Sequence, residues 1–116
     1  MVVDDSFSIR QMVKSILTAE GYNVIEAIEG KDAIRKANDQ DVHMIITDVN
    51  MPCMDGFSMI TEIRKIQKLK FVPIIVLTTE SSEEKKQEGK NAGATGWIAK
   101  PFRQEQLVTV VKKFIG

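Results

Sequence analysis

Residues 44–56 read Met-Ile-Ile-Thr-Asp-Val-Asn-Met-Pro-Cys-Met-Asp-Gly, and this stretch decides the fold. The apolar run at its start is typical of a strand buried on both faces, and it stops at Asp48. Pro52 and the pair Asp55-Gly56 then favour a turn, because proline fixes φ and the Asp-Gly pair tolerates positive φ. We therefore expect Asp48 at the carboxyl end of a buried strand, which is the edge where open α/β sheets bind ligands.

A second apolar run, Met1-Val2-Val3, also ends in acids, Asp4 and Asp5. The carboxyl ends of parallel strands meet at one edge of a sheet, so these acids are expected beside Asp48. Three neighbouring carboxylates repel one another and raise one another's pKa unless a cation joins them. Mg²⁺ is the hard, oxygen-preferring choice, so the pattern predicts a metal site. For one isolated acid, the simpler interpretation is that Asp48 caps the next helix or solvates a strand end.

The composition is that of one compact domain without a strong net charge. The chain has 116 residues, of which 43% are hydrophobic, so it can build one core and is too short for two domains. The 16 basic residues balance the 16 acidic ones, so no overall field attracts nucleic acid or an anionic membrane surface. Cys53 is the one cysteine, which excludes an internal disulfide, and no apolar run is long enough to span a bilayer. We expect a cytoplasmic monomer with a single domain, residues 1–116, that binds neither nucleic acid nor membranes.

Patterns typical of strands and helices alternate along the chain. Besides the two strands above, strands are expected at 22–27, 74–77 and 97–99, and a helix follows each strand. The first helix can begin at Ser6 or Ser8, and its apolar side chains recur at helical spacing: Ile9, Met12, Val13, Ile16 and Leu17. The helix that contains 85–91 has no large apolar residue in that range, so we expect it to be the loosest one. The alternation predicts an α/β fold, with a parallel sheet covered by helices on both faces.

Two more polar side chains belong to the same edge of the sheet. Thr78 follows the apolar run 74–77, and Lys100 follows 97–99. Carboxylates that hold a divalent cation, together with a lysine and a hydroxyl, can receive a tetrahedral dianion, because the positive groups neutralise the phosphoryl oxygens during transfer. Asp48 is the expected nucleophile. Its attack on phosphorus gives a labile acyl phosphate, which suits a reversible signal.

The order of these motifs resembles the receiver domain of two-component response regulators. The resemblance runs almost end to end and rests on Asp4-Asp5, Asp48, Met51-Pro52, Met54-Asp55-Gly56, Thr78 and Lys100-Pro101-Phe102. With Ala92-Gly93-Ala94 and Gly96-Trp97 before the lysine, the chain is most similar to single-domain chemotaxis regulators of the CheY type. The resemblance implies a doubly wound, five-stranded parallel sheet with the strand order 2-1-3-4-5.

The resemblance also implies roles for the acidic residues. Asp48 is implied to accept a phosphoryl group from a sensor histidine kinase. Asp5, Asp48 and the backbone carbonyl of Asn50 are implied to bind Mg²⁺, while Asp4 helps through water. Asn50 and Glu80 stand at positions that the family uses to tune hydrolysis, so we expect a short-lived phosphoryl group.

The resemblance also implies which residues change conformation on phosphorylation. Lys100 and Thr78 are implied to contact the phosphoryl group, with a cis peptide bond between Lys100 and Pro101 that aims the lysine into the site. Their shift is implied to be coupled to the aromatic residue three positions before the lysine. Here that residue is Trp97, where tyrosine or phenylalanine is more usual. A downstream target protein is expected to bind the face near Trp97.

Other functions stay open at this point. We expect no enzyme, because the chain would catalyse only its own phosphorylation and dephosphorylation. A phosphate sink, which drains a shared kinase and has no output target, would have the same sequence pattern. A phosphatase or phosphotransferase with an aspartyl intermediate would need a general acid two residues after Asp48, where Asn50 stands. A flavin-binding domain of related topology would carry a Ser-, Thr- and Gly-rich phosphate loop, where this chain has Asp4-Asp5-Ser6-Phe7.

Overall fold

The sheet is parallel and has the predicted order of strands. The computed structural model describes residues 1–51, 53–79 and 82–115. Within these residues, five strands pair in the order β2-β1-β3-β4-β5. The strands are β1 (Val2–Val3), β2 (Glu26–Ala27), β3 (Ile45–Thr47), β4 (Ile74–Thr78) and β5 (Gly96–Ala99). Because β1 and β3 are neighbours, the acids that follow these two strands come together at one edge of the sheet.

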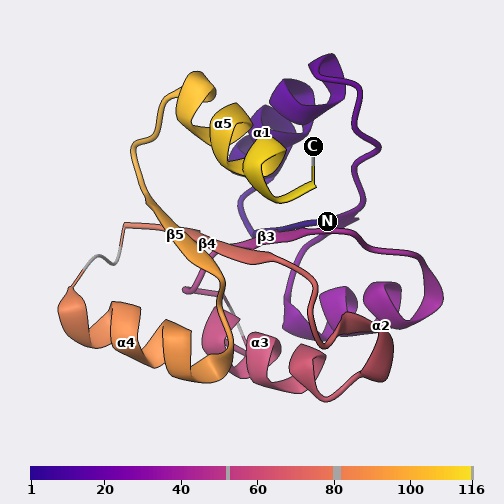
Figure 1. Cartoon of the computed structure of the whole chain (residues 1–116), viewed down its shortest axis with the longest axis vertical. Helices are drawn as coiled ribbons and strands as arrows, with labels where there is room; N and C mark the ends of the chain where they lie inside the picture. Colours follow the sequence, from indigo (N-terminus) through magenta and orange to yellow (C-terminus); the bar gives the residue numbers. More distant parts are fainter. Residues whose placement is uncertain (52, 80–81, 116) are drawn as a thin grey trace.

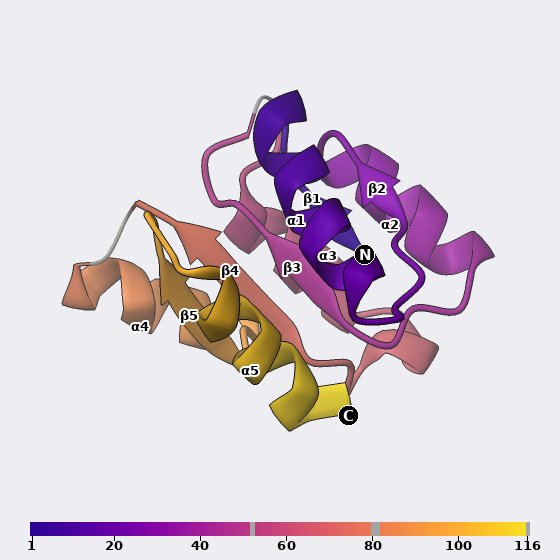
Figure 2. The same cartoon turned by 90° about the horizontal axis from the view of Figure 1, so that it is seen from above.

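Helices cover both faces of the sheet, as predicted. One face carries α1 (Phe7–Ala19) and α5 (Gln104–Ile115), and the other carries α2 (Gly30–Asp39), α3 (Gly56–Arg64) and α4 (Glu83–Ala92) (Figure 1). Seen from above, α1 lies over β1 and β3, and α5 lies over β4 and β5 (Figure 2). A short 3-10 helix, η1 (Gln67–Leu69), lies between α3 and β4. No described helix combines the length and the apolar character that crossing a membrane requires.

The side chains of alternate strand residues pack into two separate hydrophobic cores, one on each face of the sheet. Along β4, Ile74 and Val76 pack toward α2 and α3, while Ile75 and Leu77 pack toward α1 and α5. All four side chains are buried, as expected for a strand covered on both faces. Burying one side chain of this size contributes about 1.5–3 kcal/mol relative to leaving it exposed, so the strands hold both helical layers in place.

Serine side chains cap the N-termini of two helices, α1 and α4. Ser6, one of the two predicted caps of α1, accepts a hydrogen bond from the backbone N–H of Ile9 at 3.4 Å. Ser82 caps α4 in the same way by accepting from the backbone N–H of Lys85 at 3.2 Å. An N-cap of this kind satisfies a backbone donor that the first helical turn leaves unpaired.

The buried stripe of α1 differs from the prediction at one position. Met12 was expected to pack, and this is wrong, because its side chain is 43% exposed. Val13 and Leu17 are buried as predicted, and the third buried residue of α1 is Arg10. The buried face of α1 therefore includes one charged side chain, that of Arg10. Its hydrogen-bond partners lie at the candidate site.

The edge strand β2 is shorter than predicted. The pattern at 22–27 predicted a strand, but only Glu26–Ala27 is one. β2 pairs with β1 alone, in the register Val2↔Glu26 and Val3↔Ala27. An edge strand has hydrogen-bond partners on one side only. The length of β2 is therefore limited to the two residues that pair with β1.

Candidate functional site

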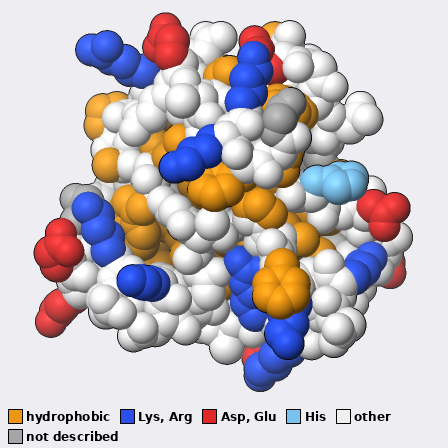
Figure 3. All heavy atoms as spheres, in the orientation of Figure 1, with side chains coloured by type: hydrophobic (Ala, Val, Ile, Leu, Met, Phe, Trp, Pro, Cys, Tyr) orange, Lys and Arg blue, Asp and Glu red, His pale blue; other side chains and the backbone are white. Residues whose placement is uncertain are grey.

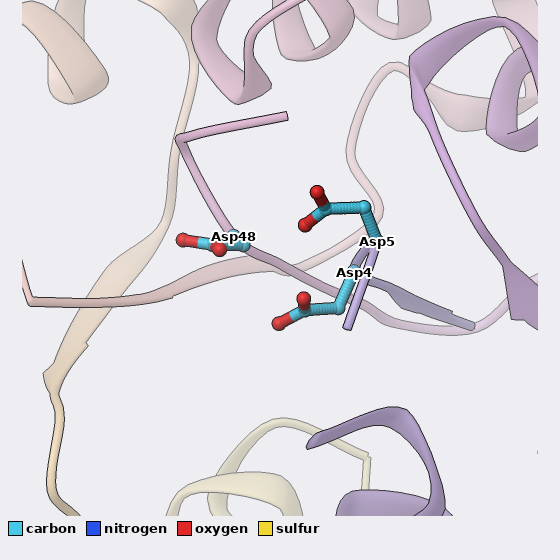
Figure 4. Close-up of side chains that lie close together, drawn as sticks. All are labelled: Asp4, Asp5 and Asp48. Carbon is cyan, nitrogen blue, oxygen red and sulfur yellow. The ribbon is translucent and has the colours of Figure 1, made fainter. Parts of the chain in front are cut away.

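Three aspartates meet at the carboxyl edge of the sheet. Asp4 and Asp5 follow β1, and Asp48 follows β3, whose Thr47 is paired with Val3. Each of the three offers a carboxylate oxygen, and these oxygens all lie within 4.8 Å of one another (Figure 4). The structure thus brings together the three acids that the sequence placed at this edge. Asp4 is buried, Asp48 is half-buried and Asp5 is exposed, so the cluster opens to solvent on one side.

Asp4 is the most enclosed member of the cluster. Its Oδ1 accepts a hydrogen bond from the backbone N–H of Ser6 at 2.8 Å. Burial raises the pKa of the Asp4 carboxyl above its ordinary value, and the charge of Asp48 acts in the same direction. The hydrogen bond from Ser6 and the charge of Lys100 oppose this rise. A cation among the carboxylates would favour the charged form of Asp4 further.

Arg10 supports the backbone of Asp4, and sequence reasoning missed it. Its Nη1 donates to the carbonyl oxygen of Asp4 at 2.9 Å, and its Nε donates to Glu26 at 3.3 Å. Glu26 also accepts from Gln11 at 2.6 Å and from Lys14 at 3.1 Å. The hydrogen bond from Lys14, and then that from Arg10, hold the pKa of Glu26 below its ordinary value despite partial burial. The strand end that carries the acidic pair is therefore braced by α1 and β2.

Asp48 lies in a loop that α3 approaches closely. Its Oδ1 accepts a hydrogen bond from the backbone N–H of Val49 at 2.7 Å, and the N–H of Gly56 donates to the carbonyl oxygen of Val49 at 2.8 Å. A Cβ at Gly56 would overlap the carbonyl oxygen of Asp48. Only glycine allows the first turn of α3 to lie this near to the backbone of Asp48. The Asp55-Gly56 pair thus closes the loop, with Asp55 as the N-cap of α3.

Lys100 reaches the acids from β5. Its Nζ lies 3.4 Å from Oδ2 of Asp4 and 3.6 Å from Oδ2 of Asp48. The peptide bond between Lys100 and Pro101 is cis, which confirms the expectation from the resemblance. Thr78, the fully buried last residue of β4, accepts a hydrogen bond at its carbonyl oxygen from the N–H of Lys100 at 2.9 Å. The threonine and the lysine are therefore adjacent at the same edge as the carboxylates.

Trp97 lies on the face of β5 that packs against α3 and α4. Its ring centroid is 6.1 Å from that of Phe57 on α3, with the ring planes at 40°. A Cβ at Gly89 would lie 3.0 Å from Cζ3 of Trp97, so α4 rests directly on the indole. Nε1 of Trp97 is buried and has no hydrogen-bond partner among the described residues. Trp97 therefore contacts both α3 and α4, and Phe57 was not predicted as a neighbour. That α4 is the loosest helix stays a prediction.

Asn50, the remaining candidate metal ligand among the described residues, follows Asp48 in the chain. Asn50 stands two residues after Asp48 with an exposed side chain, and the ligation of a metal by its carbonyl stays a prediction. Cys53 is exposed and has a positive φ of 70°. Two residues of the expected motif set, Pro52 and Glu80, lie outside the described residues.

The donor set fits a hard divalent cation. The cluster offers carboxylate oxygens alone, from Asp4, Asp5 and Asp48, and Mg²⁺ prefers oxygen ligands. Two of the three carboxylates, those of Asp4 and Asp48, pair with the ammonium group of Lys100, so the described cluster has more negative than positive charge, which a cation can offset. The same ammonium group can stabilise an anion bound to Asp48.

Comparison with known proteins agrees with this arrangement. The sequence pattern of the response regulator receiver domain matches residues 1–112. Chemotaxis protein CheY1 of Helicobacter pylori is 35% identical over 118 residues, which cover 100% of this chain and 95% of that protein. The solved structure of Vibrio cholerae chemotaxis protein CheY4 is 50% identical, with a TM-score of 0.94, and the match covers 97% of this chain and 94% of that one.

Other relatives differ in length or carry a metal. The receiver domain of sensor histidine kinase PA1611 from Pseudomonas aeruginosa is 30% identical, with a TM-score of 0.88 over 99% of this chain and 95% of that one. Its structure is described with a magnesium ion coordinated in the active site cleft. Some curated relatives are longer, and this chain spans 55% of one and 15% of another. The match along nearly the whole sequence, on a sheet of the expected order, places the chain in the response regulator receiver domain family.

Proposed function

We propose that this chain is a phosphorylation-controlled switch in which Asp48 accepts a phosphoryl group from a sensor histidine kinase. One observation carries the proposal: Nζ of Lys100 lies between the carboxylates of Asp4 and Asp48, at 3.4 Å and 3.6 Å. A lysine that served only in a structural ion pair would need a single acidic partner. Here three acids lie together at a site that opens to solvent, which favours a functional role. The similarity to chemotaxis proteins supports a chemotaxis-like pathway.

In the proposed reaction, a carboxylate oxygen of Asp48 attacks phosphorus. The new oxygen–phosphorus bond forms as the phosphorus–nitrogen bond of a phosphohistidine breaks, and the electron pair returns to the imidazole. The backbone N–H of Val49 holds Oδ1 of Asp48 and thereby orients the carboxylate. The ammonium group of Lys100 moves from the carboxylates to the negatively charged phosphoryl oxygens. The hydroxyl of Thr78 donates a hydrogen bond to one of these oxygens.

Asp4, Asp5, Asp48 and the carbonyl of Asn50 are the proposed binding groups for Mg²⁺, with Asp4 acting through water. When bound, Mg²⁺ would neutralise charge on the transferring phosphoryl group. The magnesium ion described in the PA1611 receiver domain supports this proposal. The fit of an all-oxygen donor set to this ion supports it independently.

Trp97 is the proposed link to a target protein. When Thr78 moves toward the phosphoryl group, space opens behind it and the indole can shift inward, which changes the surface formed with α4. Phosphorylation can only redistribute states that it stabilises differently, so both ring positions exist before phosphorylation. A target that prefers the inward ring then binds more tightly to the phosphorylated protein.

Several finer points are part of the same proposal. The chain acts as one domain and as a monomer, and catalyses no reaction besides its own phosphorylation and dephosphorylation. Its cytoplasmic location stays a prediction. A phosphate sink remains the alternative, and a target protein captured only by the phosphorylated form would exclude it.

Incubation with acetyl phosphate and Mg²⁺, followed by intact mass measurement, tests the proposal. The wild-type protein should gain one phosphoryl group, and Asp48→Asn should gain none. Asp55→Asn is a matched control, because Asp55 is a carboxylate of the same loop that caps α3 at Ser58, and asparagine caps equally well. Phosphorylation of Asp48→Asn to the wild-type level would overturn the proposal.

A further inference from the structure

A groove lies at the end of the sheet opposite the acidic site. It has a volume of about 710 Å³ and is lined by residues at the amino ends of β3 and β4 and at the end of α5, among them Val42, Lys68, Phe71, Pro73, Phe114 and Ile115. The strands are parallel, so this end is separated from the carboxylates by the length of the sheet. Hydrophobic side chains gather near the middle of the face seen in Figure 3, and both basic and acidic side chains lie around them.

The groove exposes apolar side chains that the fold itself does not use. Phe71 is 88% exposed and Ile115 is 37% exposed. Phe71 is more exposed than any other large hydrophobic side chain among the described residues. Burial of a phenylalanine side chain is favourable, and here that contribution is left for another molecule.

The segment that carries Phe71 is held in place by the half-buried guanidinium group of Arg64. Arg64 donates through Nη1 to the carbonyl oxygens of Leu69 at 2.9 Å, Lys70 at 3.1 Å and Val72 at 2.7 Å. Its Nε and Nη2 donate to the carbonyl oxygen of Gly93, which anchors the guanidinium at the end of α4. Backbone carbonyls on both sides of Phe71 are therefore fixed. A backbone that is already fixed reduces the entropy lost when a partner covers the side chain that it carries.

Lysine side chains lie beside the aromatic rings of the groove, and the exposed Asp41 adjoins its lining residue Val42 in the sequence. Lys68 lines the groove and no described acid does. Nζ of Lys70 lies 5.8 Å from the centroid of Phe71, and Nζ of Lys113 lies 5.6 Å from that of Phe114. Neither Lys70 nor Lys113 forms an ion pair with a described carboxylate, whereas the neighbouring Lys112 pairs with Glu20. The aromatic rings are thus bordered by cations that have no acidic partner within the described part of the chain.

We propose that this groove docks an acidic segment of a partner protein that inserts an aromatic or long aliphatic side chain beside Phe71. The apolar floor accounts for the inserted side chain, and the lysines account for its acidic neighbours. Docking here leaves the carboxylates at the other end of the sheet accessible. The inference therefore stands apart from the phosphorylation of Asp48.

A selection of random dodecapeptides displayed on phage, with the full chain as bait, tests the inference. The selected peptides should be rich in Asp and Glu around an aromatic or aliphatic residue. One selected peptide is then synthesised and titrated into ¹⁵N-labelled protein. Its binding should shift the amide signals of 67–73 and weaken about tenfold or more in Phe71→Ser, with further weakening in Lys70→Glu or when NaCl is raised from about 0.05 M to about 0.5 M.

Phe7→Ser is the matched control, because Phe7 is 68% exposed but begins α1 at the acidic edge. It should bind the peptide like the wild-type protein, and Asp48→Asn should do the same. Thermal unfolding shows whether Phe71→Ser remains folded. Selected peptides that are neutral or basic, equal binding to Phe71→Ser, or concentration-dependent shifts at 67–73 without peptide, which indicate a second copy in the groove, would each overturn the inference.

Discussion

The indole ring of Trp97 occupies the space in which a side chain at Gly89 would begin. A Cβ built at Gly89 lies 3.0 Å from Cζ3 of Trp97 and 3.0 Å from Cε1 of Phe57. Gly89 is the buried residue of α4, whose other described side chains are largely polar or charged. Gly89 thus packs against two aromatic rings, and Ala92 of the same helix packs against the same core.

Replacing Gly89 by leucine should push the indole of Trp97 outward, because the ring and the new side chain cannot share this space. Overpacking of this kind costs about 1–3 kcal/mol, so the melting temperature should fall by several degrees. Tryptophan emission should shift to longer wavelength, and quenching by iodide should increase. Lys90→Leu is the control, because Lys90 is exposed on the same helix. Unchanged emission in Gly89→Leu would mean that the ring does not depend on the glycine.

Trp97 should also report activation. Its Nε1 is buried without a described partner, and an unpaired buried donor of this kind costs about 1–3 kcal/mol, so the observed ring position is held only moderately. Beryllofluoride with Mg²⁺, a phosphoryl mimic, should change both the emission of Trp97 and its quenching by iodide. Thr78→Ala and Lys100→Ala should suppress the quenching change while metal binding persists. Identical quenching with and without the mimic would show that the ring does not switch.

The architecture could be predicted because it rests on local periodicity. The apolar runs at 44–47 and 74–77 need cover on both faces, whatever their order in the sheet. The order 2-1-3-4-5 could not come from periodicity, since many orders satisfy the same alternation, and it followed from the family resemblance. The predicted length of β2 was too great. The side-chain pattern at 22–27 does not show that only two residues of β1 pair with this strand.

The acids of the site could be predicted because the ends of adjacent parallel strands converge. Arg10 could not, since its burial depends on Glu26, 16 residues away along the chain, which the fold brings to it. An arginine next to the apolar stripe of α1 was the available signal. Phe57 was missed for the same reason, because its contact with Trp97 joins α3 to β5.

Asp4→Asn should stabilise the protein in EDTA, in a way that depends on pH. Burial raises the pKa of Asp4, so the folded state binds its proton more tightly than the unfolded state does. The stabilisation from that proton is complete below the unfolded pKa and is lost as the pH rises through the folded pKa. At neutral pH the variant should be more stable than the wild type by about 0.5–2 kcal/mol. Urea denaturation at a series of pH values should show this difference shrinking toward about pH 4, and a constant difference would contradict the assignment.

Mg²⁺ should raise the melting temperature of the wild-type protein. A ligand that binds only the folded state contributes about 2.7 kcal/mol at a concentration 100-fold above its dissociation constant, which corresponds to a shift of several degrees. Asp5→Asn should lose most of the shift, because it removes the exposed carboxylate of the cluster. Asp41→Asn, at an exposed acid on the far side of the sheet, should retain it. A melting temperature unaffected by millimolar Mg²⁺ would remove the metal site from the account.

The position of the acyl phosphate tests the central claim most directly. Borohydride reduces an aspartyl phosphate to homoserine, and peptide mass spectrometry locates the reduced residue. After incubation with acetyl phosphate and Mg²⁺, we predict homoserine in place of Asp48 in the wild-type protein, and none when Mg²⁺ is replaced by EDTA. Homoserine in place of Asp4, Asp5 or Asp55, or intact Asp48 in a protein that has gained the mass of a phosphoryl group, would contradict the account.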